Sequence, residues 1–188
     1  MTDIYATCPT LENDRWRLRL IEAGDADDLL AVYGDRLALP FFNSDNCHGD
    51  IFYYPTAERM AQAVQFWIDS YGWRYFVRFT IIDKRAGKAV GTIEMFNRGG
   101  ADAEGGVGVL RLDVGSAYER ADALSDILGL AVEPFFQWFR VDEILTKGPV
   151  YAVERAQALE ARGFVPTARP LIGEDGTAYG GYWTICRK

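Results

Sequence analysis

The sequence predicts a mixed α/β (α+β) fold, formed by a single domain that spans residues 1–188. Short runs of alternating apolar residues and longer runs with helical spacing follow one another in the order β-α-α-β-β-β-α-β-α-β-β. The chain is 49% hydrophobic and 14% aromatic, which is enough for one continuous core. We therefore expect a sheet of about seven strands with helices packed against it.

The first third of the chain predicts one strand, two helices and a long loop. Residues 16–21 alternate apolar and basic side chains, which is typical of a strand with one buried face. Asp25 is expected at the start of a helix, because acids favour the first turn, and Thr56 is expected to cap a second one. Residues 38–55 lie between these helices and contain five aromatic residues and the only histidine, His48. This loop is therefore expected to cover another part of the molecule.

The middle of the chain predicts a hairpin, a further strand and the longest helix. Residues 73–83 and 89–97 are rich in β-formers, and the five residues between them, 84–88, include a glycine. Residues 107–114 form the next predicted strand. Apolar residues then recur at helical spacing from 116 to about 138.

The last third predicts a short strand over residues 143–146 and a helix over 152–161. Gly163 follows this helix and is expected to adopt the left-handed conformation that ends many helices. Two more strands are expected, at residues 164–167 and 179–186.

The composition limits the partners and the compartment. The 20 basic and 27 acidic side chains give a net charge of −7, which disfavours nucleic acid and anionic membranes and mildly favours cationic partners such as amines. The three cysteines lie far apart without a C-x-x-C pair, so neither a disulfide framework nor a metal site is expected. No apolar leader or membrane-length apolar run is present, and we expect a cytoplasmic protein. The sequence does not decide the oligomeric state, and a homodimer stays open.

Three segments together carry a resemblance to a known family. These are the strand-helix-strand-helix order of residues 106–165, the hairpin of residues 83–93, and the helix-to-strand segment of residues 158–165, which reads ALEARGFV. This order resembles the GNAT N-acetyltransferase superfamily, in particular its ribosomal-protein-alanine acetyltransferase branch. The resemblance implies a mixed, mostly antiparallel sheet in which two parallel strands, ending at Val114 and Thr146, splay apart to open a cofactor cleft.

The resemblance also implies an acyl-CoA-dependent N-acetyltransferase that acts on a small amine or on a protein N-terminal amine. In such enzymes the pyrophosphate of acetyl-CoA lies on a glycine-rich turn and on the N-terminus of the following helix. The positions of this chain that match the cofactor site are Val114, Arg120, Ala121, Asp122, Ala123, Leu124 and Ala152.

The chain departs from the family at this turn, where Arg120 and Asp122 fill the two glycine positions. Asp122 and the neighbouring Glu119 would repel a phosphate unless they point away from it. Alternatively, Ser116 and Glu119 form a capping box that occupies the helix N-terminus. The second alternative favours a different function, namely a GNAT-like module that binds a ligand or a protein without transferring an acetyl group.

Acetyl transfer needs a group that accepts the amine proton and a group that protonates the leaving thiolate. Glu94 and Asp113 lie on predicted central strands, which border the substrate cleft in the GNAT fold, so both are candidate catalytic carboxylates. A surface ion pair with Arg111 is the other interpretation of these acids. The family's usual tyrosine is replaced by Leu159. Tyr118 is the candidate acid in its place, and Tyr151 is the other tyrosine near enough in the sequence to substitute. His48 follows Cys47 directly, and no third member of a catalytic triad can be identified.

Overall fold

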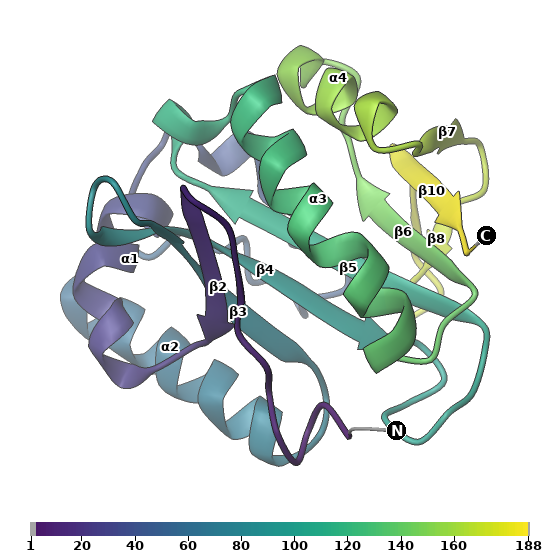
Figure 1. The fold of residues 1–188 in the computed structure, drawn as a ribbon, viewed down its shortest axis with the longest axis horizontal. Coiled ribbons are helices and arrows are strands. Elements are labelled where there is room, and N and C mark those ends of the chain that lie inside the picture. Colours follow the sequence, from purple (N-terminus) through teal and green to yellow (C-terminus); the bar gives the residue numbers. More distant parts are fainter. Residues whose placement is uncertain (1–2, 188) are drawn as a thin grey trace.

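The computed structural model describes residues 3–187 and contains an eight-stranded sheet with helices on both faces (Figure 1). The sheet order is β1-β2-β3-β4-β5-β6-β10-β7. Its strands are β1 (Leu11–Glu12), β2 (Trp16–Leu20), β3 (Val77–Asp83), β4 (Lys88–Asn97), β5 (Val107–Val114), β6 (Glu143–Lys147), β7 (Val165–Thr167) and β10 (Tyr182–Cys186). A separate hairpin pairs β8 (Leu171–Ile172) with β9 (Ala178–Tyr179). The helices are α1 (Ala26–Tyr33), α2 (Ala57–Gly72), α3 (Ala121–Trp138) and α4 (Val153–Ala161).

The predicted fold class and element order are confirmed, with more strands than expected because short edge strands and the β8–β9 hairpin add to the count. All neighbouring strands of the large sheet are antiparallel except β5 and β6. This parallel pair is joined from Val107 opposite Glu143 to Leu110 opposite Thr146. Since β5 continues to Val114 without a partner on β6, the two strands separate at their C-terminal ends as the resemblance implied.

One face of the sheet is apolar and packs against α3 and α4. On β3, Val77, Phe79 and Ile81 belong to this core, because alternate residues of a strand point to the same side. Phe79 stacks on Phe135 of α3 with ring centroids 5.3 Å apart. In Figure 1, α3 crosses in front of the sheet on this side.

The other face carries a row of buried polar side chains under α1 and α2. The intervening residues of β3, Arg78 and Thr80, point to this side and are 1% and 0% exposed. Aromatic residues of the 38–55 loop, including Phe52 and Tyr54, pack with α1 and α2 in a second core. The loop therefore covers the polar face of the sheet, as its composition predicted.

Local signals set most of the element boundaries. The Thr56 hydroxyl accepts a hydrogen bond from the Arg59 amide at 3.2 Å and caps α2. Gly163 has φ +84° and ends α4 in the predicted left-handed conformation.

The start of α3 differs from the sequence prediction. Residues Ser116–Tyr118 form a 3-10 turn, and Glu119 has ψ 65°, so the α-helix begins at Ala121 instead of Ser116. The capping box, one of the alternatives considered for Ser116 and Glu119, is wrong, because the Glu119 carboxylate turns toward α4 and binds Arg155. A charge-assisted pair with a guanidinium outcompetes a backbone cap here.

Candidate active site

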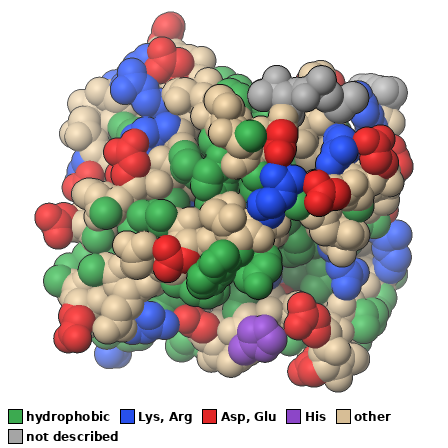
Figure 2. Space-filling model, turned by 90° about the horizontal axis from the view of Figure 1, so that it is seen from below, with side chains coloured by type: hydrophobic (Ala, Val, Ile, Leu, Met, Phe, Trp, Pro, Cys, Tyr) green, Lys and Arg blue, Asp and Glu red, His purple; other side chains and the backbone are tan. Residues whose placement is uncertain are grey.

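A cavity of about 670 Å³ opens on the polar face of the sheet, between α2, the 38–55 loop and the strands β3, β4 and β5. Figure 2 shows hydrophobic side chains gathered around a hollow beside the single histidine, His48. Seven of the 17 residues that line the cavity are aromatic: Phe52, Tyr54, Phe66, Trp67, Tyr75, Phe76 and Phe96. Charged groups form its floor and its rim.

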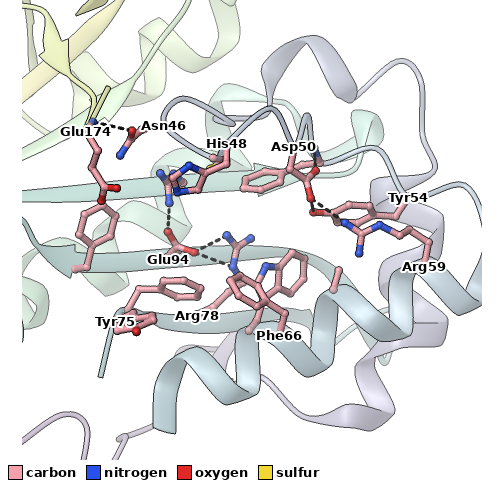
Figure 3. A pocket seen from close by; sticks show the side chains of 17 residues that line it. Asn46, His48, Asp50, Tyr54, Arg59, Phe66, Tyr75, Arg78, Glu94 and Glu174 are labelled. Carbon is pink, nitrogen blue, oxygen red and sulfur yellow. Dashed lines mark hydrogen bonds and ion pairs between the residues drawn. The ribbon is translucent and has the colours of Figure 1, made fainter. Parts of the chain in front are cut away.

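The floor of the cavity is a buried cluster of Arg78, Glu94 and Arg111 from three adjacent strands (Figure 3). The Arg78 Nε donates to Glu94 Oε2 at 3.0 Å, and Arg111 Nη1 donates to the other oxygen, Oε1. The exposed fractions are 1% for Arg78, 0% for Glu94 and 8% for Arg111. The strand register puts Glu94 opposite both arginines, so the sheet itself assembles the cluster. The surface ion pair considered from the sequence is therefore a buried cluster.

The environment of Glu94 makes it a weak base. Burial by itself would raise the pKa of Glu94, but Arg78 and Arg111 outweigh it and hold the pKa below its usual value. The carboxylate is thus ionised and has both oxygens engaged by guanidinium groups. Its main physical effect is to keep two buried cations compensated.

Asp113 lies two residues beyond Arg111 on the same face of β5 and is fully buried. Its Oδ1 accepts from the Asn43 amide at 3.1 Å, and its Oδ2 lies 3.9 Å from Arg78 Nη1. Burial raises the pKa of Asp113 to about 6, with Arg78 and the Asn43 amide opposing the shift. A carboxyl group with this pKa is better matched to proton exchange near neutral pH than Glu94.

Arg78 connects the two carboxyl groups. It binds Glu94 on one side, and its Nη1 donates to the Tyr33 hydroxyl at 3.1 Å and to Thr92 at the same distance. The Tyr33 hydroxyl in turn lies 3.4 Å from Asp113 Oδ2. The guanidinium also lies 4.0 Å from the ring centroid of Trp67, which fixes it against α2.

The segment Asn43–His48 crosses the sheet beside the cavity. Besides the Asn43 contact, Asp45 binds Lys147 of β6 and accepts from the Tyr182 hydroxyl at 3.0 Å. Cys47 and His48 both line the cavity, but burial raises the pKa of the Cys47 thiol to about 11, so it stays protonated at neutral pH. His48 is exposed at the rim, and no hydrogen bond joins it to Cys47 among residues 3–187.

The cleft between the splayed strands contains side chains of α4. Arg155 extends from the first turns of α4 and donates from Nη1 to the Leu112 carbonyl at 2.7 Å. Its Nε and Nη2 donate to the two oxygens of Glu119 at 2.7 and 2.6 Å. Both side chains are buried, with 3% and 6% exposed. Arg155 therefore binds the part of β5 that β6 leaves when it turns away, and Glu119 compensates its charge.

The residues predicted to bind the cofactor at the turn after β5 differ in where their side chains lie. Arg120 and Asp122 are exposed, and Asp122 points toward Arg120 and Arg15 at 3.4 and 4.0 Å. Ala123 and Leu124 face the core, so only their backbone is available to a ligand. The Ala121 amide donates to the Glu154 carboxylate of α4 at 2.7 Å.

The remaining predicted residues lie at the edges of the cleft. Val114 is buried at the end of β5, and Ala152 is buried at the N-terminus of α4. Tyr118 has other neighbours: its ring packs against that of Trp16, with the ring centroids 6.0 Å apart. Burial raises the pKa of Tyr118 most, and the nearby Asp83 carboxylate raises it further. The structure thus does not bring Tyr118 together with Glu94 or Asp113.

Sequence reasoning missed three residues of these sites: Arg78, Arg155 and Tyr33. A signal existed for Arg78, which interrupts the apolar run of β3 as Glu94 interrupts that of β4. Arg155 and Tyr33 gave no comparable signal, because basic residues and tyrosines are common on helices. No helix within residues 3–187 is long and apolar enough to cross a bilayer, and in the same residues no group of three or more potential ligands is arranged to hold a metal ion.

Solved acetyltransferase structures share this fold. The ribosomal-protein-S5-alanine acetyltransferase of Vibrio fischeri superposes with a TM-score of 0.69 at 17% identity, covering 95% of this chain and 96% of that one. A GCN5-related N-acetyltransferase of Brucella melitensis gives 0.70 at 16% identity, covering 95% and 78%. AAC(6')-Ib, solved with paromomycin and acetyl-CoA, gives 0.65 at 16% identity, covering 93% and 94%. No protein-family model and no curated protein matches the sequence. The chain therefore has the GNAT acetyltransferase fold.

The chemistry of the cleft can be compared with that of acetyl-CoA. The donors at the turn, Arg155 and the Ala121 amide, already hold carboxylates, so they form a site of the right kind for an anion. The amides of Asp122 and Ala123 have no partner within residues 3–187. The donor set fits a diphosphate, provided that Glu119 and Glu154 turn away.

Proposed function

We propose that this protein is an acyl-CoA-dependent N-acetyltransferase whose acceptor amine binds in the aromatic cavity. The observation that carries the proposal is the splay of β5 from β6 next to that cavity, which Arg111 of β5 lines. Asp113 lies on the same face of β5, buried behind the lining residues, and the Leu112 carbonyl is bound by Arg155 at the cleft. The GNAT fold of the neighbours supports the same reaction class. A cofactor cleft and an acceptor pocket on one strand are what a transfer between two bound substrates requires.

Acetyl-CoA supplies an acetyl group activated as a thioester. On the protein's side, we propose that the α3 N-terminus and Arg155 hold the diphosphate, while Val114 and Ala152 border the cleft. Asp113 is the preferred proton acceptor, because its pKa of about 6 leaves it ionised at neutral pH and still basic. Glu94 orients Arg78 and Arg111 at the floor of the acceptor cavity.

The acceptor class proposed is a small amine or a protein N-terminal amine. The cavity is large enough for a side chain with its backbone, and its aromatic wall suits an acceptor with apolar surface. Phe66 and Tyr75 are more than half exposed at the cavity and extend the aromatic surface outward. Such a rim favours an acceptor that continues beyond the cavity, as a peptide does.

The test combines cofactor binding with an acceptor panel. Calorimetric titration with acetyl-CoA is expected to show saturable binding, and thiol release is then measured with polyamines, aminoglycosides and peptides that have a free N-terminus. The same peptides with a blocked N-terminus are the matched control and should release no thiol. Turnover is expected to fall as the pH drops through about 6, since protonated Asp113 accepts no proton.

Absence of acetyl-CoA binding would contradict the proposal. The chain would then fit the alternative of a GNAT-like module that binds a ligand or a protein without acetyl transfer. The observation that favours this alternative is the buried ion pair of Arg155 with Glu119, in which Arg155 also binds the open edge of β5.

A further inference from the structure

Two carboxylates of the protein itself, those of Glu119 and Glu154, bind the donors at the cleft between β5 and β6. We propose that Glu119 and Glu154 occupy the anion-binding groups of the cleft as internal substitutes for phosphate, and that an acyl-CoA displaces them and takes over Arg155. This inference rests on the proposed function and adds to it a binding residue and a device that controls access to the cleft.

The pair of Arg155 and Glu119 has the geometry of a phosphate contact. Two guanidinium nitrogens each donate to a separate oxygen at 2.7 and 2.6 Å, which is the bidentate arrangement that arginine uses for carboxylate and phosphate alike. The third donor, Nη1, is anchored on the Leu112 carbonyl. Arg155 can therefore exchange its anion while the Leu112 bond keeps the guanidinium in the cleft.

The second carboxylate, from Glu154, sits on the N-terminus of α3. Its bond with the Ala121 amide at 2.7 Å engages one of the donors that a helix N-terminus offers to an anion. Glu154 is exposed, so turning it into solvent costs little. Because both Arg155 and Glu154 lie at the start of α4, one helix supplies the cation and one of the two displaceable anions.

The turn that carries Glu119 can release it. Glu119 lies between the 3-10 turn at Ser116–Tyr118 and the first residue of α3, outside any regular ladder. Its side chain is held by Arg155 alone among the side chains of residues 3–187. Exchange of this carboxylate for a diphosphate keeps the buried guanidinium paired throughout, which avoids the large cost of an unpaired buried charge.

With competition of this kind, the apparent affinity for the cofactor equals the intrinsic affinity multiplied by the fraction of molecules in which the cleft is open. Weakening either internal anion should therefore tighten binding. Removing the cation should weaken it, because Arg155 is needed by both the internal and the external anion. The change in affinity for acetyl-CoA thus has opposite signs for the anions and for Arg155. This difference distinguishes a residue that binds the cofactor from one that only blocks the cleft.

The experiment is calorimetric titration with acetyl-CoA of the wild type and of Glu154→Ala, Glu119→Gln and Arg155→Gln, with Glu160→Ala as the matched control. Glu160 is also exposed on α4 and changes the net charge equally, but lies at the other end of the helix. We expect Glu154→Ala and Glu119→Gln to bind about fivefold tighter each, the control to stay within about twofold, and Arg155→Gln to bind at least about tenfold weaker.

Each result has one meaning, provided that circular dichroism shows folded protein. Equal affinity in all variants overturns this inference and leaves the acetyltransferase proposal standing. Tighter binding by Arg155→Gln shows that the arginine only blocks the cleft, which also overturns it. No binding by any variant removes the acyl-CoA function and this inference together. Glu154→Ala alters an exposed side chain and so keeps the test valid if Glu119→Gln does not fold.

Discussion

Two buried ionic clusters lie along β5 and differ in what holds them. In the cavity, Glu94 is bound between Arg78 and Arg111, and all three residues belong to adjacent strands of one sheet. In the cleft, Glu119 and Arg155 come from a turn and a helix that no strand pairing joins. Backbone ladders therefore fix the floor of the cavity, whereas the cleft pair is held by bonds between side chains and by one bond from Arg155 to the Leu112 carbonyl. We therefore expect the proposed acceptor site to be preformed and the proposed cofactor site to be able to open.

The largest effect is expected from removing the anion at the centre of the cavity. Glu94→Ala leaves two buried guanidinium groups without their shared counter-charge, and we expect a loss of about 5 kcal/mol in the free energy of unfolding. Denaturant unfolding measures it, with Glu133→Ala on the exposed side of α3 as control, expected within about 0.5 kcal/mol. A loss below about 1 kcal/mol would mean that water compensates the arginines and that the cavity is not rigidly preformed.

The cleft pair should cost less to break, because its carboxylate lies at the end of a turn that can move into water. Arg155→Met is expected to lower the free energy of unfolding by about 3 kcal/mol, and Arg162→Met, an exposed change at the residue that follows the same helix, by less than about 1 kcal/mol. Combining Arg155→Met with Glu119→Leu should recover part of the loss, since the unpaired carboxylate is then gone. If the double variant loses more free energy of unfolding than the two single variants lose when added together, the cleft is as rigid as the cavity.

The pH dependence of stability distinguishes Asp113 from Glu94. Burial raises the pKa of Asp113 from 3.8 to about 6, so between these pH values the folded protein binds more protons than the unfolded chain. The stability contributed by this group therefore falls as the pH rises through that range, by up to about 3 kcal/mol for two pKa units.

Asp113→Asn cannot ionise, and it should match the wild type near pH 4 and exceed its stability at pH 8. Asp126→Asn, on the exposed side of α3, is the control and should show no such divergence. Parallel curves for Asp113→Asn and the wild type would show that the carboxyl group titrates normally and would weaken its proposed role as the base.

The smallest effect is expected at the outward-facing acid of the turn. Asp122 is 62% exposed and lies near Arg120 and Arg15, so it repels a bound phosphate only weakly. Asp122→Gly should tighten acetyl-CoA binding by at most about fivefold, less if the glycine also loosens the first turn of α3. A larger gain than that of Glu154→Ala would show that repulsion at Asp122, not the internal anions, limits binding.

Much of the fold could be predicted because its signals are local. The alternation in β2, the threonine cap of α2 and the left-handed Gly163 each depend on a few consecutive residues. The same alternation places Glu94 and Asp113 on the polar face of their strands, which is why both were found as candidates. The start of α3 was missed because the Glu119 carboxylate, predicted as a local cap, binds a guanidinium 36 residues away.

Apart from the short edge strands, the β8–β9 hairpin and the start of α3, the sequence by itself determined the strands, the helices and the face of the sheet on which strand residues lie, since these follow from backbone geometry and periodicity. The tertiary structure decided which charges meet. Tyr33 and Asp113, 80 residues apart, share one buried network, and Arg155 reaches the strand edge that β6 leaves open. Such contacts carry no periodic signal, because each depends on how the whole chain folds back on itself. They place one ionic cluster in the cavity and the other at the open edge of β5.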